Sequence, residues 1–486
     1  MSWKGYFRFE KDKQSVLDWL RYSWLWGLIW EYGVIMSNDY LDSVSDFVYS
    51  TQWEDLPAIA QSAAKNVLMD TLGAILAGSQ LPQNSALAAL APRLGGIGAI
   101  SLFGHTAQTT TLFAAMVNAT AGVSLELDEG NRLGGGHPSI HVTPASIAVT
   151  EELGLSGKDL LLSLVLGYEV ISRVGRATTM RLDVHSHGTW GTIGSAVATA
   201  KLMGFDASKI QKAINVSLSM SPANTWTPCL EGATIRNLYP GRSSFNGILA
   251  CHLVDSGFTG IRNGPGDLYT NLLGDGFDPS IVVEGLDEVN EYRIQRNYFK
   301  SHACCLYNHP VLDAVESIVS QYEFNCDQIT SILVSVPPIA LILDNPEPSN
   351  MLATKFSIPY AIGAALVLGR TDVTAFKAEH ARNPDIQKIA QKVHLEPDPR
   401  MDLRRYDYPS ARVCIKLCDD RSLEESIIAQ YGDVNNPMTQ VQLESKFVDL
   451  AQEVIGLERT RAVVETVASL EKVTDITELT RLLRNG

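Results

Sequence analysis

Two short segments of the sequence concentrate residue types that carry out acid–base chemistry. One is LELDEGNRLGGGHPSIH at 125–141, where acidic residues precede a glycine run and a histidine; the other is VHSHGTWG at 184–191. Imidazole titrates near neutral pH and a nearby carboxylate can orient it, so these residues suit proton transfer. The candidate catalytic residues are Asp128, His137, His185 and His187.

Two other roles are open for these histidines. His137 and His141 stand four residues apart, a spacing that can place two metal ligands on one helical face, but Pro138 would lie inside any helix that carried both. His185 and His187 share a face if the stretch is extended, so the pattern leaves open which of them reaches a substrate. Polar residues that only cap helices would give the same composition.

Basic side chains that could bind an anion follow in two later segments. The segment ATIRNLYPGRSS at 233–244 places an arginine on each side of a predicted Pro-Gly turn, and YFKSHACCLYNHP at 298–310 combines a lysine, two histidines and two thiols. Arginine binds a carboxylate through two parallel hydrogen bonds, whereas plain surface charge is the alternative. The predicted substrate-binding residues are Arg132, Arg236, Arg242, Lys300, His302 and Cys305.

Helical periodicity dominates the first half of the chain after residue 56. Apolar residues recur at helical spacing, and several segments are rich in Ala, Gly and Ser, which lets helices pack closely. Ser156 with Asp159 predicts a capping box, and Gly204 followed by Asp206 ends one helix and caps the next. Helices are predicted at 57–77, 82–92, 108–127, 157–175, 191–203 and 206–220.

Beyond residue 290 the pattern mixes strands and helices. The β-branched runs at 329–336 and 411–417 predict strands, and 422–428 can pair with the second of them. Helices are predicted at 309–322, 357–369 and 383–393, and again at 439–455, 458–471 and 476–484.

The predicted fold class is mostly α, with a large all-helical domain and a smaller α+β lid domain. Residues 1–36 hold five of the eight tryptophans without a sustained period, so we interpret them as an N-terminal appendage outside the fold. The helical domain then begins with residues 37–291, the lid covers 292–428, and 429–486 return to the helical domain.

Composition and missing motifs exclude several classes of protein. The net charge of -15 and a pI near 5.2 argue against a nucleic-acid partner. The apolar run at 22–30 is far shorter than the ~20 residues of a membrane span, and no nucleotide-binding glycine loop, GxSxG or HExxH occurs. Seven scattered cysteines without a CxxC fit a reduced, cytoplasmic protein.

The order of these segments resembles the MmgE/PrpD family, which includes 2-methylcitrate dehydratase, cis-aconitate decarboxylase and iminodisuccinate epimerase. The resemblance runs from about residue 40 to the C-terminus. It implies a helical domain, a lid domain and an active site between them in a homodimer, with neither metal nor organic cofactor. It is carried by NVLMDTLGAILAGSQ (66–80), the ELD and GHPS pieces, ATAKLMG (198–204), HACC with HP (302–310) and FSIPY (356–360).

The resemblance also assigns histidines and basic residues of the family to this sequence. The histidine of the HPS piece falls on His137. The next active-site histidine falls on His185 when GTIG at 191–194 is aligned without gaps, or on His187 if the loop differs. Arg236 stands where decarboxylase-like members have a lysine, and Lys300 opens the domain-junction motif.

Acidic positions and two departures complete the comparison with the family. The acidic pair falls on Asp128, with Glu126 or Glu129 nearby. Residues 131–136 are less polar than in decarboxylase- and dehydratase-like members, and a tyrosine of cis-aconitate decarboxylases falls near Leu341. These departures favour dehydratase- or epimerase-like chemistry over decarboxylation.

The function predicted from the sequence is therefore that of a cofactor-free lyase or isomerase. It would abstract a proton next to a carboxylate on a small di- or tricarboxylate, as 2-methylcitrate dehydratase or iminodisuccinate epimerase does. A histidine would act as the base, and basic residues would hold the carboxylates and the developing charge. The alternatives are a cis-aconitate decarboxylase-like enzyme, a metal-dependent hydratase and a non-catalytic acid-binding protein.

Overall fold

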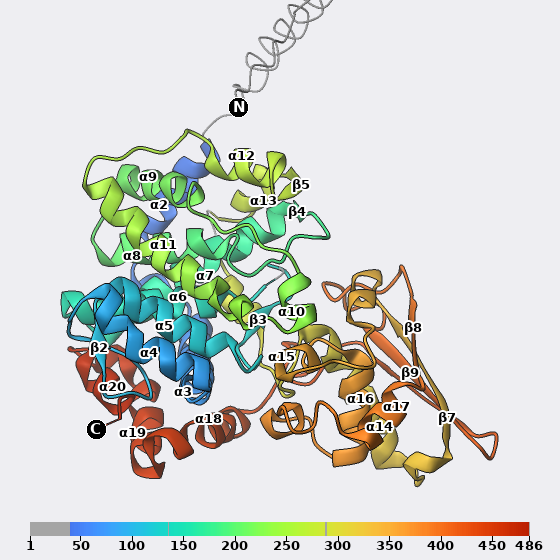
Figure 1. The fold of residues 1–486 in the computed structure, drawn as a ribbon. Coiled ribbons are helices and arrows are strands. Elements are labelled where there is room, and N and C mark those ends of the chain that lie inside the picture. The colour runs from blue at the N-terminus through green and yellow to red at the C-terminus, as the bar shows by residue number, and fades with distance from the viewer. Residues whose placement is uncertain (1–38, 135, 287–288, 486) are drawn as a thin grey trace, which may run out of the picture.

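The computed structural model describes residues 39–134, 136–286 and 289–485, so the predicted N-terminal appendage at 1–36 lies outside the described residues. Figure 1 shows a large helical part and, beside it, a smaller part that contains a sheet. The prediction of a mostly α protein with a smaller α+β domain is confirmed. None of the helices in these ranges is both long and apolar enough to cross a membrane.

Closely packed helices form the large part. Its helices are α2 (Asp39–Ser50), α3 (Ala58–Ser79), α4 (Pro82–Gly95), α5 (Thr111–Val123), α6 (Pro138–Leu153), α7 (Gly157–Ala177), α8 (Gly191–Leu202), α9 (Ala207–Leu218), α10 (Thr227–Glu231), α11 (Leu238–Asp255), α12 (Gly264–Asn271) and α13 (Pro279–Val283). Small residues permit the contacts: a Cβ on Gly247 of α11 would lie 2.3 Å from the Ser195 Cβ of α8. The capping box predicted at Ser156 and Asp159 is present at the start of α7.

Two short antiparallel pairs complete this part. They are β1 (Ile100–Ser101) with β2 (Gln108–Thr109), and β4 (Thr178–Met180) with β5 (Gly274–Phe277).

Helix α6 differs from the sequence prediction, which gave no helix between 127 and 157. It begins at Pro138, and His137 is its N-cap residue. A proline is tolerated at the first helical position because the N–H groups of the first turn have no intrahelical partner. Pro138 therefore starts the helix and does not interrupt it, and it fixes the backbone directly after His137.

Helix α11 replaces the predicted Pro-Gly turn between Arg236 and Arg242. Pro240 lies in its first turn, where it again removes no intrahelical bond. Gly241 faces α5 so closely that a Cβ there would lie 2.7 Å from the Met116 carbonyl oxygen. The Pro-Gly pair thus serves close helix packing; Arg242 lies on α11, and Arg236 lies in the 3-10 helix directly before it.

The smaller part is a four-stranded sheet with helices packed against it. Its strands are β7 (Ile329–Val336), β8 (Val393–Pro397), β9 (Ala411–Leu417) and β10 (Ser422–Ile427), and its helices are α14 (His309–Gln321), α15 (Met351–Thr354), α16 (Ile358–Leu368) and α17 (Pro384–Ala390). The order is β10-β9-β7-β8, with β7 and β8 parallel and the other pairs antiparallel. The predicted strands at 329–336 and 411–417 are confirmed, whereas the short, polar edge strand β8 was missed.

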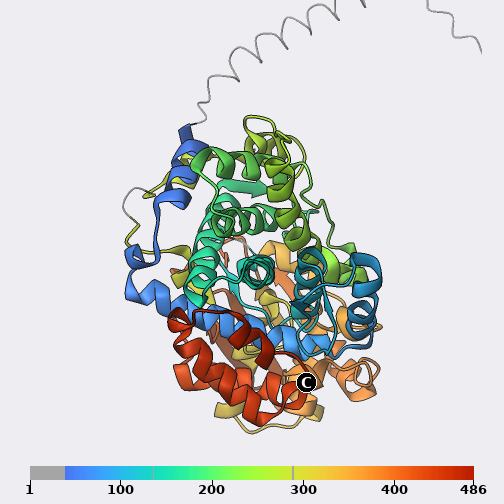
Figure 2. The ribbon, with the colours of Figure 1, turned by 90° about the vertical axis from the view of Figure 1, so that its left-hand side faces the viewer.

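The chain crosses between the two parts twice. Where the chain leaves the helical part, β6 (Asn297–Tyr298) pairs antiparallel with β3 (Gly130–Asn131). The segment that carries Lys300 therefore lies beside the acidic loop at 124–134. After the smaller part the chain returns to the helical part, and Figure 2 shows its last helices beside α3. They are α18 (Gln440–Ile455), α19 (Leu457–Ala468) and α20 (Thr477–Leu482).

Candidate active site

A buried cluster of polar side chains forms where the acidic loop, the start of α6 and the outgoing crossing segment meet. Except for His137, whose side chain is 11% exposed, each member is at most 3% exposed. Arg236 comes from the 3-10 helix η2 (Thr234–Asn237), and two histidines come from the loop before α8. The members are Glu126, Asp128, His137, His185, His187, Arg236 and Lys300.

Two cations and two carboxylates form the charged half of this cluster. The Lys300 Nζ donates to Glu126 Oε2 at 3.2 Å and lies 3.8 Å from Asp128 Oδ1, while the Arg236 guanidinium contacts the Glu126 carboxylate directly. Burial alone would raise the pKa of Glu126, but the charges of Arg236 and Lys300 outweigh it and hold that pKa well below its usual range. The formal charges of the four groups cancel.

Glu126 lies between the two cations, a position that the sequence left open between Glu126 and Glu129. Its backbone has φ +56°, which is uncommon for a residue with a side chain and is typical of strained functional positions. Glu129 instead accepts the Ser139 N–H at 2.8 Å and the Tyr168 hydroxyl at 2.8 Å, and burial raises its pKa to about 8. Glu126 therefore faces the site, whereas Glu129 supports the loop behind it.

The hydrogen bond of His137 prepares one of its ring nitrogens for proton transfer. Nδ1 donates to the Glu129 carbonyl oxygen at 2.7 Å, so the neutral ring carries its lone pair on Nε2. Asp128 Oδ2 lies 3.4 Å from the same Nδ1. Burial lowers the pKa of His137, which keeps the ring in its basic form at neutral pH.

His185 has the opposite tautomer. Its Nδ1 accepts the His187 backbone N–H at 3.0 Å, so the proton of the neutral ring lies on Nε2. The ring packs against Trp226, with ring centroids 4.3 Å apart. His185 can therefore donate a hydrogen bond to a ligand, while His137 can accept a proton.

Several buried polar atoms of the cluster lack a hydrogen-bond partner among the described residues. Native proteins satisfy most buried polar groups, so an unpaired group that can reach a shared space points to a missing polar ligand. The unpaired atoms include both carboxylate oxygens of Asp128, Nε2 of His185, both ring nitrogens of His187 and Nε of Arg236.

Two predicted substrate-binding residues are bound elsewhere. The Arg132 guanidinium pairs with Asp433 at 3.0 Å and donates to the Ser410 hydroxyl at 3.1 Å. It therefore links Ser410 of the lid to Asp433 of the segment that follows the lid. The His302 ring contacts Thr371 Oγ1 at 2.6 Å and Asp313 Oδ1 at 2.9 Å, inside the lid. Arg132 and His302 thus make structural contacts in the free protein, and their predicted contact with substrate stays a prediction.

Two further predicted substrate-binding residues, Cys305 and Arg242, lie at the edge of the cluster. Burial raises the pKa of Cys305 to about 11, so this thiol beside Glu126 is neutral. Arg242 donates to Asn224 Oδ1 at 2.5 Å, and the backbone carbonyl of Asn224 accepts the His185 N–H at 2.8 Å. Arg242 is half-buried and supports the loop that carries His185.

Some nearby residues were missed by the sequence analysis. Trp226 packs on His185, Tyr298 on His137, and Lys355 donates to the carbonyl oxygens of Leu125 and Ala303 at 3.1 and 2.9 Å. No local pattern marks them, because they reach the site through the pairing of distant segments. Burial lowers the pKa of Lys355 to about 8.

Among the residues that the structure describes, two groups of side chains have the donor types of a metal site. In the cluster, Asp128, His137 and His187 offer ligand atoms within 4.8 Å of one another; in the lid, His302, Asp313 and Glu316 do the same. The cationic Lys300 and Arg236 beside the first group oppose a divalent cation, and both ring nitrogens of His302 are already engaged.

We expect activity to survive exhaustive chelation. The reason is the positive charge of Lys300, 3.8 Å from Asp128, which weakens the hold of that carboxylate on a metal ion. The measurement compares turnover before and after dialysis against a strong chelator. A loss that zinc, iron or manganese restores would contradict the cofactor-free reaction.

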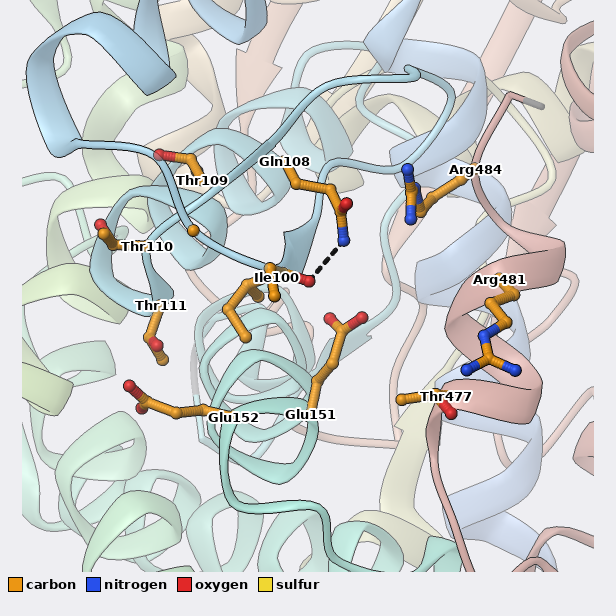
Figure 3. Close-up of a pocket in the computed structure, with 12 residues that line it drawn as sticks. Ile100, Gln108, Thr109, Thr110, Thr111, Glu151, Glu152, Thr477, Arg481 and Arg484 are labelled. Atoms are coloured by element: carbon orange, nitrogen blue, oxygen red, sulfur yellow. Dashed lines mark hydrogen bonds between the residues drawn. The ribbon is translucent and has the colours of Figure 1, made fainter.

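A separate pocket of about 500 Å³ lies at the other end of α6 (Figure 3). At 1.5 Å per residue this helix places Glu151 and Glu152 of the pocket roughly 20 Å from His137. Arg481 and Arg484 also line the pocket, so its two positive and two negative charges balance and select no charge type of ligand. None of the predicted site residues lines it.

A helical fold, a smaller α+β part and a buried cluster of acid and base side chains are the features to compare with known proteins. The family model of the MmgE/PrpD N-terminal domain matches residues 42–265, and that of the MmgE/PrpD C-terminal domain matches 302–472. The chain therefore belongs to the MmgE/PrpD family, which confirms the resemblance seen in the sequence.

Three of the curated relatives of the chain are cis-aconitate decarboxylases. Cis-aconitate decarboxylase of Mus musculus is 27% identical over 393 residues, which cover 76% of this chain and 78% of that protein. Cis-aconitate decarboxylase of Aspergillus terreus is 23% identical over 460 residues, covering 88% and 93%. The human cis-aconitate decarboxylase is 26% identical over 392 residues, covering 76% and 79%.

Proposed function

We propose that this chain is a cofactor-free lyase or isomerase that transfers a proton at the carbon next to a carboxylate of a small di- or tricarboxylate. The observation that carries the proposal is the position of His137 beside two buried cations. Its Nδ1 is bound to the Glu129 carbonyl, which leaves Nε2 as the base, and Arg236 and Lys300 can bind carboxylates.

In the proposed reaction, Arg236 and Lys300 bind a substrate carboxylate and take over part of the contact that Glu126 makes in the free protein. His137 Nε2 accepts the proton of the adjacent carbon, and negative charge develops on the carboxylate oxygens. The positive charge of Lys300 stabilises this enolate-like state in a water-poor site. The His185 Nε2–H donates a further hydrogen bond.

The fate of the resulting carbanion distinguishes the possible reactions. Loss of hydroxide from the neighbouring carbon gives dehydration, and return of the proton to the other face gives epimerisation. We place these first because Leu341 stands near the position of a decarboxylase tyrosine and is 36% exposed in the 3-10 helix η6 (Pro338–Leu343).

Decarboxylation of cis-aconitate is the second candidate. It is favoured by the names of the curated relatives and by the same pair of cations, which would suit a tricarboxylate. Loss of carbon dioxide also leaves a carbanion, and His137 in its protonated form would then return a proton to it.

Proton exchange with solvent tests the proposal. We expect the protein, in heavy water, to introduce deuterium at a carbon next to a carboxylate of citrate-like hydroxy acids or amino- and imino-dicarboxylates, without releasing carbon dioxide. Nuclear magnetic resonance follows the exchange, and His137→Ala protein is the control. Rapid release of carbon dioxide from cis-aconitate would support the second candidate, and no reaction with any of these acids would contradict both.

A further inference from the structure

His187 has hydrogen-bonding capacity that the proposed reaction does not use. Its side chain is 3% exposed, and neither ring nitrogen has a hydrogen-bond partner in the described part of the chain. The ring stacks on His137, with centroids 4.6 Å apart and planes 16° apart. A buried imidazole with two unpaired nitrogens is costly, so its presence beside the base requires a ligand contact.

The neighbouring histidines differ from His187 in this respect. His137 donates to the Glu129 carbonyl, His185 accepts the His187 backbone N–H, and His141 Nδ1 contacts the Ser243 hydroxyl at 2.6 Å. The first two contacts fix a tautomer, because a carbonyl only accepts and a backbone N–H only donates, and the third engages one ring nitrogen of His141. No contact fixes the tautomer of His187, so its ring can donate to an oxygen atom or accept from it.

The position of this ring relative to its neighbours suits a single oxygen atom. One nitrogen of His187, one nitrogen of His137 and one oxygen of Asp128 lie within 4.8 Å of one another. Two hydrogen bonds of about 2.8 Å that diverge tetrahedrally from one oxygen separate their outer atoms by roughly 4.6 Å. A substrate oxygen between His187 and Asp128 would therefore pair with one unpaired atom of each, and the adjacent Lys300 and Arg236 oppose a metal ion there.

We propose that His187 is a specificity-determining residue that, together with Asp128, binds an alcohol hydroxyl of the substrate beside the base His137. The inference rests on the proposed function, because it assumes that Arg236 and Lys300 bind the carboxylates. A carboxylate at this position would meet the negative charge of Asp128, whereas a hydroxyl can donate to Asp128 and accept from His187. The site therefore prefers a hydroxy acid to the same acid without its hydroxyl.

The other charged and titratable groups around His187 do not provide this contact. Burial lowers the pKa of His187 and the Arg236 charge lowers it further, so the ring is neutral. Besides Arg236, the titratable groups in and around the cluster are Glu126, Asp128, Glu129, His137, His141, His185, Tyr239, Tyr298, Lys300 and Cys305.

Binding of a matched pair of acids tests the inference. Citrate and propane-1,2,3-tricarboxylate differ only in the hydroxyl, and their dissociation constants can be measured from tryptophan fluorescence. We expect the wild-type chain to bind citrate at least about 10-fold more tightly. His187→Leu fills the space of the ring with an apolar side chain. It should reduce the ratio of the two dissociation constants to about 1 and change the affinity for propane-1,2,3-tricarboxylate by less than about 3-fold.

Two further variants make the result independent of folding. His141→Gln changes a buried histidine that lies next to the cluster, and it should leave the citrate preference intact. His187→Gln keeps a hydrogen-bond donor and an acceptor, and it should retain part of the preference. Equal binding of both acids by the wild type, or an unchanged preference in His187→Leu, overturns the inference and leaves the proposed function standing. Failure of both acids to bind overturns the tricarboxylate substrate as well.

Discussion

His137→Ala is expected to lower kcat by about 10²–10⁴-fold, the usual contribution of a general acid or base. The bond from Nδ1 to the Glu129 carbonyl orients the ring, so removal of the imidazole removes a base that is already in position. Stability should change little, because the side chain makes no capping bond to α6 and is partly exposed. Steady-state kinetics and a thermal melt check the two parts.

His137→Gln provides the matched control for this prediction. Its amide N–H can replace the bond to the Glu129 carbonyl but cannot take up a proton, so kcat should stay low while the melting temperature equals the wild-type value. A variant that melted early and kept its turnover would show that His137 is only structural.

The pH profile of the wild-type chain checks the same residue. Because burial lowers the pKa of His137 below 6.5, the basic form predominates above that pKa, and kcat/KM should fall as the pH drops through it.

The fold was predictable wherever one periodicity dominates a segment. Strand β7 was found with its bounds because Ile329–Val336 is β-branched and buried in the sheet. Helices α6 and α11 were not found, because Pro138 was interpreted as interrupting a helix and Pro240 as part of a turn. A proline in the first turn and a proline in a loop have the same local sequence, and only the packing of the following residues distinguishes them.

The site was predictable in its residue types and less so in its contacts. Arg132 lies only five residues from His137, yet the pairing of β3 with β6 turns its side chain toward Asp433 and the lid. Glu126 and Glu129 are equally plausible in sequence, and the positive φ of Glu126 decides which one faces the cations. Such directions depend on contacts between distant segments, which the sequence alone does not show.

Arg236→Ala should raise KM for a dicarboxylate by about 10- to 100-fold, the loss expected for a buried, charge-assisted contact. Two effects act in the same direction. The substrate loses a guanidinium partner, and Glu126 loses one of the two cations at its carboxylate, so the cluster gains a net negative charge that repels the incoming anion. Kinetics with the diacid and with its monoester separates the charge effect, because the monoester carries one negative charge less and should lose less.

Three variants define what Arg236 contributes. Arg236→Lys keeps the charge without the two-pronged geometry and should recover part of the affinity. Arg242→Ala removes a half-buried arginine that is hydrogen-bonded to Asn224, and it should raise KM less than Arg236→Ala does. Combining Arg236→Ala with Glu126→Gln restores the charge balance, and KM for the diacid should then fall relative to Arg236→Ala alone. If Arg236→Ala weakened the diacid and the monoester equally, Arg236 would hold no substrate carboxylate, and the cation pair would serve only to support the loop of Glu126.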